Sequence, residues 1–280
     1  MQRLKSFLTF VKIEHTLFSL PLIYSGVFLA VKEPPNTSLL LLVLLAAVGA
    51  RTVALTINRI IDRKIDGRNP RTMGRELPSG RMSIMEASIV LLLGLLLYFV
   101  AAALISRFCL LLSPIPLLIF TFYPYMKRFT SLAHLGVGLG LSMGPLGGWF
   151  AVVGSFQNIL PGALLSVFTF LWVSGFDIIY STLDELFDRE ESLHSFSAKY
   201  GKRRALRISA YFHALAFMTL GLLFVIYIRG ITALPFLLVS GYLLFLEHKK
   251  AEDVEFAFFR VNAVLGFAVL GMVMSGVYLP

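Results

Sequence analysis

Long apolar runs separated by short polar segments recur along all 280 residues, and they constrain the fold more than any other feature. A helix of about 20 mostly apolar residues crosses a bilayer, and nine runs approach this length. Their approximate bounds are 16–31, 38–61, 83–105, 108–125, 132–153, 161–180, 208–228, 232–246 and 256–279. Only 15% of the residues are charged, against about 25% in soluble domains. The sequence therefore predicts an all-α polytopic membrane protein, with one transmembrane domain over residues 1–280.

The basic residues are divided unevenly between the two sides that nine spans define. Of 25 Lys and Arg residues, only Lys32, Arg107 and Arg229 fall on the side away from the N-terminus. Basic loops are retained in the cytoplasm, so we expect a cell-membrane protein whose N-terminus and longer polar loops are cytoplasmic. The opening stretch MQRLKSFLTFVKIEH is amphipathic, which is typical of a segment in the membrane interface. This asymmetry accounts for the net charge of +9 without nucleic-acid binding.

Two acidic motifs stand at the ends of apolar runs. Asn58, Asp62 and Asp66 follow the spacing i, i+4, i+8 at the end of the second run. On a helix these three side chains share one face. Carboxylates at the end of a membrane helix are costly to keep there, so a functional site is the default interpretation. The alternative for any one of them is a salt bridge at a helix end, but the repeated pattern favours a site.

The second motif lies at the end of the sixth run. Asp177, Tyr180, Asp184 and Asp188 follow the spacing i, i+3, i+7, i+11, and a continuous helix would place them on one face. Both motifs fall on the same side of the membrane and precede basic loops. Oxygen ligands suit hard cations such as Mg²⁺, which proteins often bind together with a phosphate group. The neighbouring Arg and Lys residues therefore predict a site for a metal-bound phosphate compound.

These motifs resemble the signatures of the UbiA family of intramembrane prenyltransferases. The first signature is followed by NPRT at 69–72 and PSGR at 78–81, and YPYMKR at 123–128 and LHSFSAKYG at 193–201 also match. The resemblance implies a bundle of nine helices around a central cavity that opens laterally to lipid. It also implies transfer of a polyprenyl group from its diphosphate to an acceptor, usually an aromatic ring.

The resemblance assigns roles to individual residues. Two Mg²⁺ ions would bridge the diphosphate, one held by Asp62 and Asp66 with help from Asn58, the other by Asp184 and Asp188. Asp62, Arg71 and Asp184 would be catalytic. The positions expected to bind substrate are Asn58, Arg71, Arg75, Tyr123, Lys127, Asp177, Tyr180 and His194.

The loop GRNPRTMGRELPSGRMS resembles that of the 4-hydroxybenzoate prenyltransferases and of related menaquinone-pathway enzymes. We therefore expect polyprenyl diphosphate as donor and an aromatic acceptor such as 4-hydroxybenzoate, in quinone or related lipid biosynthesis. A naphthoate, geranylgeranylglycerol phosphate or haem is the alternative acceptor. An ion-coupled transporter is the contrasting hypothesis, but its carboxylates would lie in mid-membrane, within inverted repeats.

An arginine is expected to bind the carboxylate of such an acceptor, because its planar fork matches a carboxylate. Arg71 and Arg75 are the first candidates, since both lie just beyond the metal ligands. Arg51 lies two helical turns before Asn58, and a buried arginine needs a partner. That partner is the acceptor carboxylate, Asp177 or Asp184.

Overall fold

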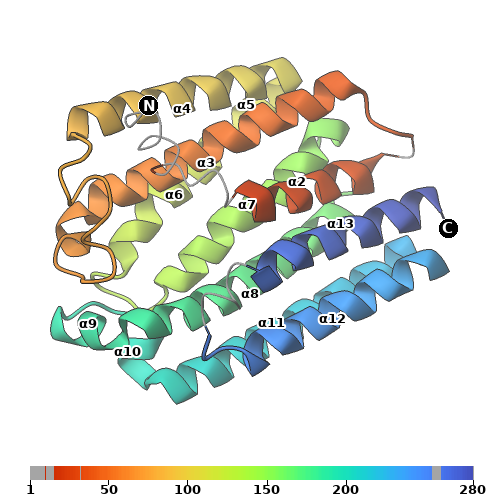
Figure 1. Cartoon of the computed structure of the whole chain (residues 1–280). Coiled ribbons are helices and arrows are strands. Elements are labelled where there is room, and N and C mark those ends of the chain that lie inside the picture. The colour runs from red at the N-terminus through yellow and green to blue at the C-terminus, as the bar shows by residue number, and fades with distance from the viewer. Residues whose placement is uncertain (1–9, 11–15, 32, 254–259, 280) are drawn as a thin grey trace.

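The structure is a computed structural model, which describes residues 10, 16–31, 33–253 and 260–279. It is built of helices joined by short loops (Figure 1), and the described residues contain no β-strand. The helices are α2 (Thr16–Ala30), α3 (Thr37–Asp66), α4 (Ile84–Ile105), α5 (Arg107–Leu112), α6 (Pro114–Met126), α7 (Ala133–Val153), α8 (Leu160–Ser181), α9 (Glu185–Glu190), α10 (Phe196–Tyr200), α11 (Lys202–Leu223), α12 (Leu234–Lys249) and α13 (Asn262–Tyr278). Short helical turns add η2 (Thr182–Asp184), η3 (Phe224–Ile228) and η4 (Ile231–Ala233).

Seven helical segments of the described chain are long and apolar enough to cross a membrane. One of them joins α5 and α6, which are interrupted at Ser113. The shorter apolar helices α2 and α13 bring the arrangement close to the nine predicted spans. The predicted all-α membrane fold is confirmed. The amphipathic N-terminal stretch lies outside the described residues except for Phe10, and so does the start of the predicted ninth span.

Close helix packing in the middle of the bundle depends on the glycines of α7. A Cβ atom added at Gly138 would collide with Ser174 of α8, and one added at Gly148 would collide with the Ile23 carbonyl of α2. Glycine therefore lets α2 and α8 approach α7 at backbone distance. The buried face of α8, which includes Leu165, forms the centre of the largest hydrophobic cluster.

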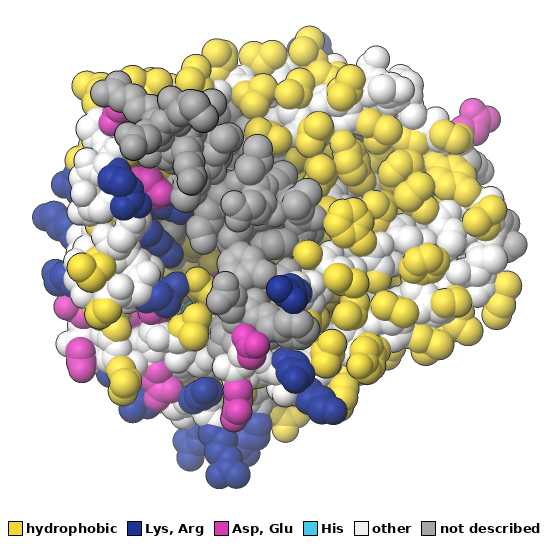
Figure 2. All heavy atoms as spheres, in the orientation of Figure 1, with side chains coloured by type: hydrophobic (Ala, Val, Ile, Leu, Met, Phe, Trp, Pro, Cys, Tyr) yellow, Lys and Arg dark blue, Asp and Glu magenta, His cyan; other side chains and the backbone are white. Residues whose placement is uncertain are grey.

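The outer surface divides into an apolar part and a charged end. Figure 2 shows most charged side chains gathered at one end of the molecule, while hydrophobic side chains cover much of the remaining face. The exposed apolar residues include Leu92 and Leu96 on α4, Leu118 on α6, and Tyr242 and Phe245 on α12. Such a surface suits lipid contact, since water would make it a large unfavourable patch.

A buried polar cluster joins the four C-terminal spans. The His213 and His248 rings approach to 2.9 Å between Nδ1 and Nε2, and the Glu247 carboxylate accepts a hydrogen bond of 3.3 Å from Asn262 Nδ2. Asn262 in turn accepts from Trp172 Nε1 at 2.9 Å. The sequence spacing of the histidines gave no sign of this contact, because the residues lie on separate helices.

The helix of the sixth span continues through the second acidic motif as predicted, over Leu160–Glu190, but it changes type within the motif. The α-helix ends at Ser181, the turn η2 follows, and α9 begins at Glu185. The hydroxyls of Ser181 and Thr182 donate to the carbonyls of Ile178 and Ile179, at 2.8 and 2.7 Å. Such side-chain bonds to the preceding turn compete with helical hydrogen bonding and bend a helix.

Candidate active site

The two acidic motifs meet at one end of the bundle. Figure 1 shows the loop that follows α3 and the short helices α9 and α10 at the same end. Lys127, which follows α6, lies between the motifs: its Nζ is 2.6 Å from Asp62 Oδ2, and it also interacts electrostatically with Asp188. Residues far apart in the sequence thus form one site at the charged end.

The first motif is buried and hydrogen-bonded. Asp62 is 3% exposed, and it receives a hydrogen bond of 3.2 Å from Asn58 Nδ2. Arg128 Nη2 donates to Asp62 Oδ1 at 3.2 Å and to the Ile61 carbonyl at 3.0 Å. Arg128 is therefore a second cation on Asp62 that was not among the predicted site residues.

The polar loop between α3 and α4 covers the site and links the motifs. Arg71 donates to both oxygens of Asp184, with Nε at 2.9 Å from Oδ1, and donates to the Tyr180 hydroxyl at 2.7 Å. Asn69 Nδ2 also donates to Asp184 Oδ1, at 2.8 Å. Arg75 Nη1 donates to Asp66 Oδ2 at 2.8 Å. This loop thus supplies cations to a carboxylate of each motif.

The protonation of Arg71 is secured by these contacts. Burial by itself lowers the pKa of an arginine, but the hydrogen bonds from Arg71 to Asp184 and the interaction with Tyr180 raise its pKa above the ordinary value. Its guanidinium also lies over the Tyr180 ring, 4.9 Å from the centroid. Arg71 is a permanent cation facing the second motif.

A buried ion pair anchors the same loop. Arg59 and Glu76 are 5% and 4% exposed, and Arg59 Nη1 lies 2.6 Å from Glu76 Oε2. The Arg59 guanidinium also lies 5.1 Å from the centroid of the Phe10 ring. Sequence reasoning missed this pair, although the single Glu of a basic loop was an available signal. The pair holds the loop in place beside the metal-ligand candidates.

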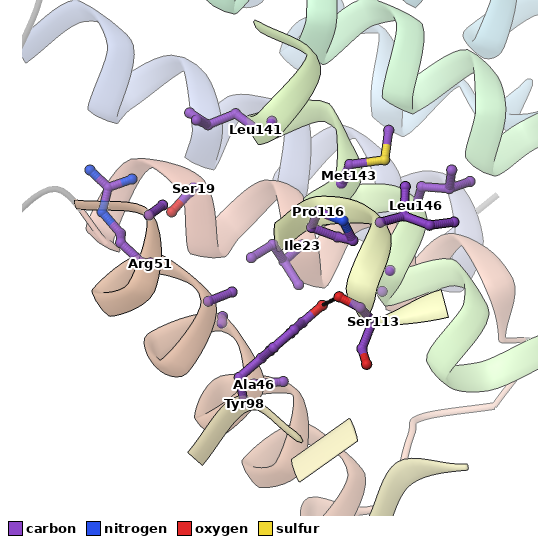
Figure 3. Close-up of a pocket in the computed structure, with 18 of the residues that line it drawn as sticks. Ser19, Ile23, Ala46, Arg51, Tyr98, Ser113, Pro116, Leu141, Met143 and Leu146 are labelled. Atoms are coloured by element: carbon purple, nitrogen blue, oxygen red, sulfur yellow. Dashed lines mark hydrogen bonds between the residues drawn. The ribbon is translucent and has the colours of Figure 1, made fainter. Parts of the chain in front are cut away.

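An apolar cavity of about 440 Å³ extends from the site into the bundle (Figure 3). Small residues on two facing helices leave this space open, including Ala46 and Ala50 on α3 and Gly144 and Gly147 on α7. A Cβ atom added at Gly147 would meet nothing within 4 Å. Tyr98 contributes a hydroxyl, but that group already donates to the Ser113 carbonyl at 3.2 Å. The cavity is therefore suited to a hydrocarbon chain.

The end of the cavity next to the motifs is polar. Arg51, Tyr123 and Asp177 line it from α3, α6 and α8. Tyr123 interacts electrostatically with Arg51, Asp177 and Asp62, so these groups are close neighbours. Arg51 Nε is buried without a hydrogen-bond partner, and no ion pair of Arg51 is seen among the described residues. Neither Asp177 nor Asp184, the two candidate partners, pairs with it.

Asp177 contacts a histidine that the sequence did not single out. His134 Nδ1 is 2.6 Å from Asp177 Oδ2, and the Phe196 backbone N–H donates to His134 Nε2 at 3.4 Å. His194, by contrast, has an exposed side chain. Its backbone N–H donates to the Lys127 carbonyl at 2.7 Å, so this residue joins the two loops through its main chain.

The donor chemistry of the motifs fits Mg²⁺, because it consists of carboxylate and amide oxygens. Among the described residues, no three acidic, His or Cys side chains lie close enough together to hold a metal ion. Lys127, Arg71 and Arg75 instead neutralise carboxylates of the motifs. A metal would fit once these long side chains turn from the carboxylates to the oxygens of a bound diphosphate.

The chain is similar in sequence to a known protein family and to individual members of it. A model of the UbiA prenyltransferase family matches residues 19–275. A 4-hydroxybenzoate octaprenyltransferase from Vibrio atlanticus is 31% identical over 87% of this chain and 86% of its own length. One from Tolumonas auensis is 30% identical over 92% of this chain and 88% of its own.

Solved structures show the same fold. The apo structure of a UbiA homologue from Aeropyrum pernix K1 has a TM-score of 0.86 and 34% identity, covering 95% of this chain and 98% of that one. A UbiA homologue from Archaeoglobus fulgidus, bound to GPP and Mg²⁺, has a TM-score of 0.69 at 20% identity, covering 95% and 99%. At that identity the second likeness concerns the fold alone.

Proposed function

Because the chain belongs to the UbiA prenyltransferase family, we propose that this prenyltransferase moves a polyprenyl group from polyprenyl diphosphate to 4-hydroxybenzoate or a similar hydroxyaryl acid. The observation that carries the acceptor class is Arg51. It is a cation without a carboxylate partner among the described residues, at the polar end of an otherwise apolar cavity. An acceptor carboxylate supplies the missing partner, and the guanidinium fork suits it.

This arrangement favours Arg51 over Arg71 and Arg75 for the acceptor carboxylate. The latter two already face Asp184 and Asp66 across the mouth of the site. Their place in the covering loop suits the donor diphosphate, toward which they can turn when metal binds the carboxylates. Arg71 and Arg75 would then each have an anionic partner, a carboxylate before the substrate binds and the diphosphate afterwards.

The remaining residues have roles that follow from their positions. Asp62, Asp66, Asp184 and Asp188, with Asn58, would hold Mg²⁺. When bound, the metal would neutralise the negative charge that develops on the leaving diphosphate.

Lys127 and Arg71 add fixed positive charge beside the diphosphate, with the Tyr180 hydroxyl hydrogen-bonded to Arg71. Tyr123 lines the cavity and interacts electrostatically with Asp62, so it would lie near the reacting carbon of the donor. The apolar walls keep water from the allylic cation while they bind the polyprenyl tail. We propose that the charged end of the bundle is cytoplasmic, where diphosphates and Mg²⁺ are available.

The test is a transfer assay in membranes that contain the protein. Geranyl or longer prenyl diphosphate and Mg²⁺ are supplied with 4-hydroxybenzoate, a dihydroxynaphthoate, geranylgeranylglycerol phosphate or haem b. We expect a product prenylated at the carbon ortho to the hydroxyl of 4-hydroxybenzoate, identified by mass spectrometry and NMR. Membranes with Asp184→Ala serve as the inactive control. Reaction with geranylgeranylglycerol phosphate or haem b alone would refute the acceptor class.

A further inference from the structure

Asp177 lies apart from the other carboxylates of its motif. It comes seven residues before Asp184, a separation of about 10 Å along a helix. Asp177 is one of the residues that line the cavity, and Asp184 is not. Asp184 instead accepts hydrogen bonds from the loop residues Asn69 and Arg71. Asp177 therefore faces the cavity, where the proposed function would place the acceptor ring.

His134 fixes the Asp177 carboxylate by one oxygen. Since His134 Nε2 accepts from the Phe196 N–H, the proton of the neutral imidazole is on Nδ1 and is donated to Asp177 Oδ2 at 2.6 Å. No hydrogen bond to Asp177 Oδ1 is seen among the described residues. The Asp177 side chain is 21% exposed, and it lines the cavity. One oxygen is held and the other is available.

Prenylation of a ring carbon requires a base at this place. The allylic carbon forms a bond to the ring carbon ortho to the hydroxyl, and its bond to the diphosphate oxygen breaks with the electron pair leaving on the diphosphate. The ring carbon then carries both its hydrogen and the new prenyl group. Loss of that hydrogen as a proton returns the C–H electron pair to the ring and restores aromaticity.

We propose that Asp177 is the general base that accepts this proton on Oδ1, and that His134 is a positioning residue that holds the carboxylate toward the ring. The assignment rests on the proposed transfer to an aromatic acceptor. Lys127, Arg71 and Arg75 pair with Asp62, Asp184 and Asp66 at the mouth of the site. Asp188 interacts electrostatically with Lys127, and these four carboxylates would bind metal during turnover. The proton passes from Asp177 to solvent when the product leaves the cavity.

Asp177→Asn is the informative variant, because the amide keeps the shape and can still accept from His134. We expect kcat for transfer to fall by about 10²-fold or more, the usual effect of losing a general base. Acceptor deuterated at both carbons ortho to the hydroxyl should show a larger isotope effect on kcat in the variant, since proton removal becomes slow. Release of diphosphate by hydrolysis of the donor without acceptor should be unchanged. Glu190→Gln, an exposed carboxylate-to-amide change on α9, is the matched control.

A second pair of variants covers the case in which Asp177→Asn fails to fold. His134→Leu removes the donor and should lower kcat without changing KM for the prenyl diphosphate, and should also increase the isotope effect. His134→Gln retains an N–H donor and should recover much of the rate.

Unchanged isotope effects in all three variants, or an equal loss of donor hydrolysis and transfer, would overturn the assignment. Failure of the wild-type protein to prenylate any hydroxyaryl acid would instead refute the proposed function, and the base with it. The wild-type assay therefore separates the two failures.

Discussion

Replacement of Arg51 by Met should lower the affinity for the acceptor without lowering the stability of the folded protein. A hydrogen bond between charged groups contributes about 1.5–3 kcal/mol, and each 1.4 kcal/mol is a factor of about ten in affinity. We therefore expect KM for 4-hydroxybenzoate to rise roughly 10- to 150-fold. KM for the prenyl diphosphate should remain the same, because Arg51 does not contact the motif carboxylates in the described structure.

The same Arg51→Met substitution should leave the stability of the folded protein unchanged or increase it. Arg51 Nε is buried without a partner, so the folded protein bears the desolvation of this group without a compensating hydrogen bond. Met fills a similar volume and removes that penalty. The unfolding temperature of Arg51→Met in detergent should therefore equal or exceed that of the wild type. A simple loss of folding could not give both results.

The assay compares an acceptor that carries a carboxylate with one that does not. 4-Hydroxybenzamide, used as a competing ligand, should bind the wild type and Arg51→Met about equally. Arg107→Met, which removes an exposed arginine at the start of α5, controls for the loss of a positive charge. Equal weakening of the acid and the amide would refute the assignment of Arg51 to the carboxylate, and a fall in unfolding temperature would refute the stability argument.

Three further predictions concern the metal, the covering loop and the orientation. Transfer should require Mg²⁺ or Mn²⁺, and Asp62→Ala should be extractable but inactive; full activity of that variant in excess EDTA would contradict the metal site. Glu76→Ala should cost about 3–5 kcal/mol, because it leaves Arg59 buried without its partner, whereas Glu190→Ala at the surface should be neutral in the same thermal unfolding assay. A cysteine added to either motif loop should be labelled from the cytoplasm and one beside Arg229 from outside; labelling of the two loops from opposite faces would exclude a shared site.

The apolar runs and the charges by themselves determined the architecture. A bilayer allows few spanning structures, so runs of this length could only be helices, and the basic loops predicted which ends of these helices share one side. The spacing of Asp62 and Asp66 placed them on one face of α3, which the structure shows as a helix that ends at Asp66. Local periodicity was sufficient for these conclusions because each depends on one helix at a time.

Only the tertiary structure decided which side chains meet. Asp177 is paired with His134, Arg59 is paired with Glu76, and Arg51 has no ion-pair partner among the described residues. The sequence predicted none of these three outcomes. Such contacts join separate segments of the chain. They depend on how each helix is rotated about its axis and how far it is shifted along that axis relative to its neighbours.

The turn η2 after Ser181 likewise changes the helical register between Asp177 and Asp184, which the spacing of the motif did not predict. A periodic pattern carries no information about a local break that two hydroxyl groups produce. The division of the second motif between cavity and mouth, which separates Asp177 from Asp184, therefore became visible only when the helices were packed together.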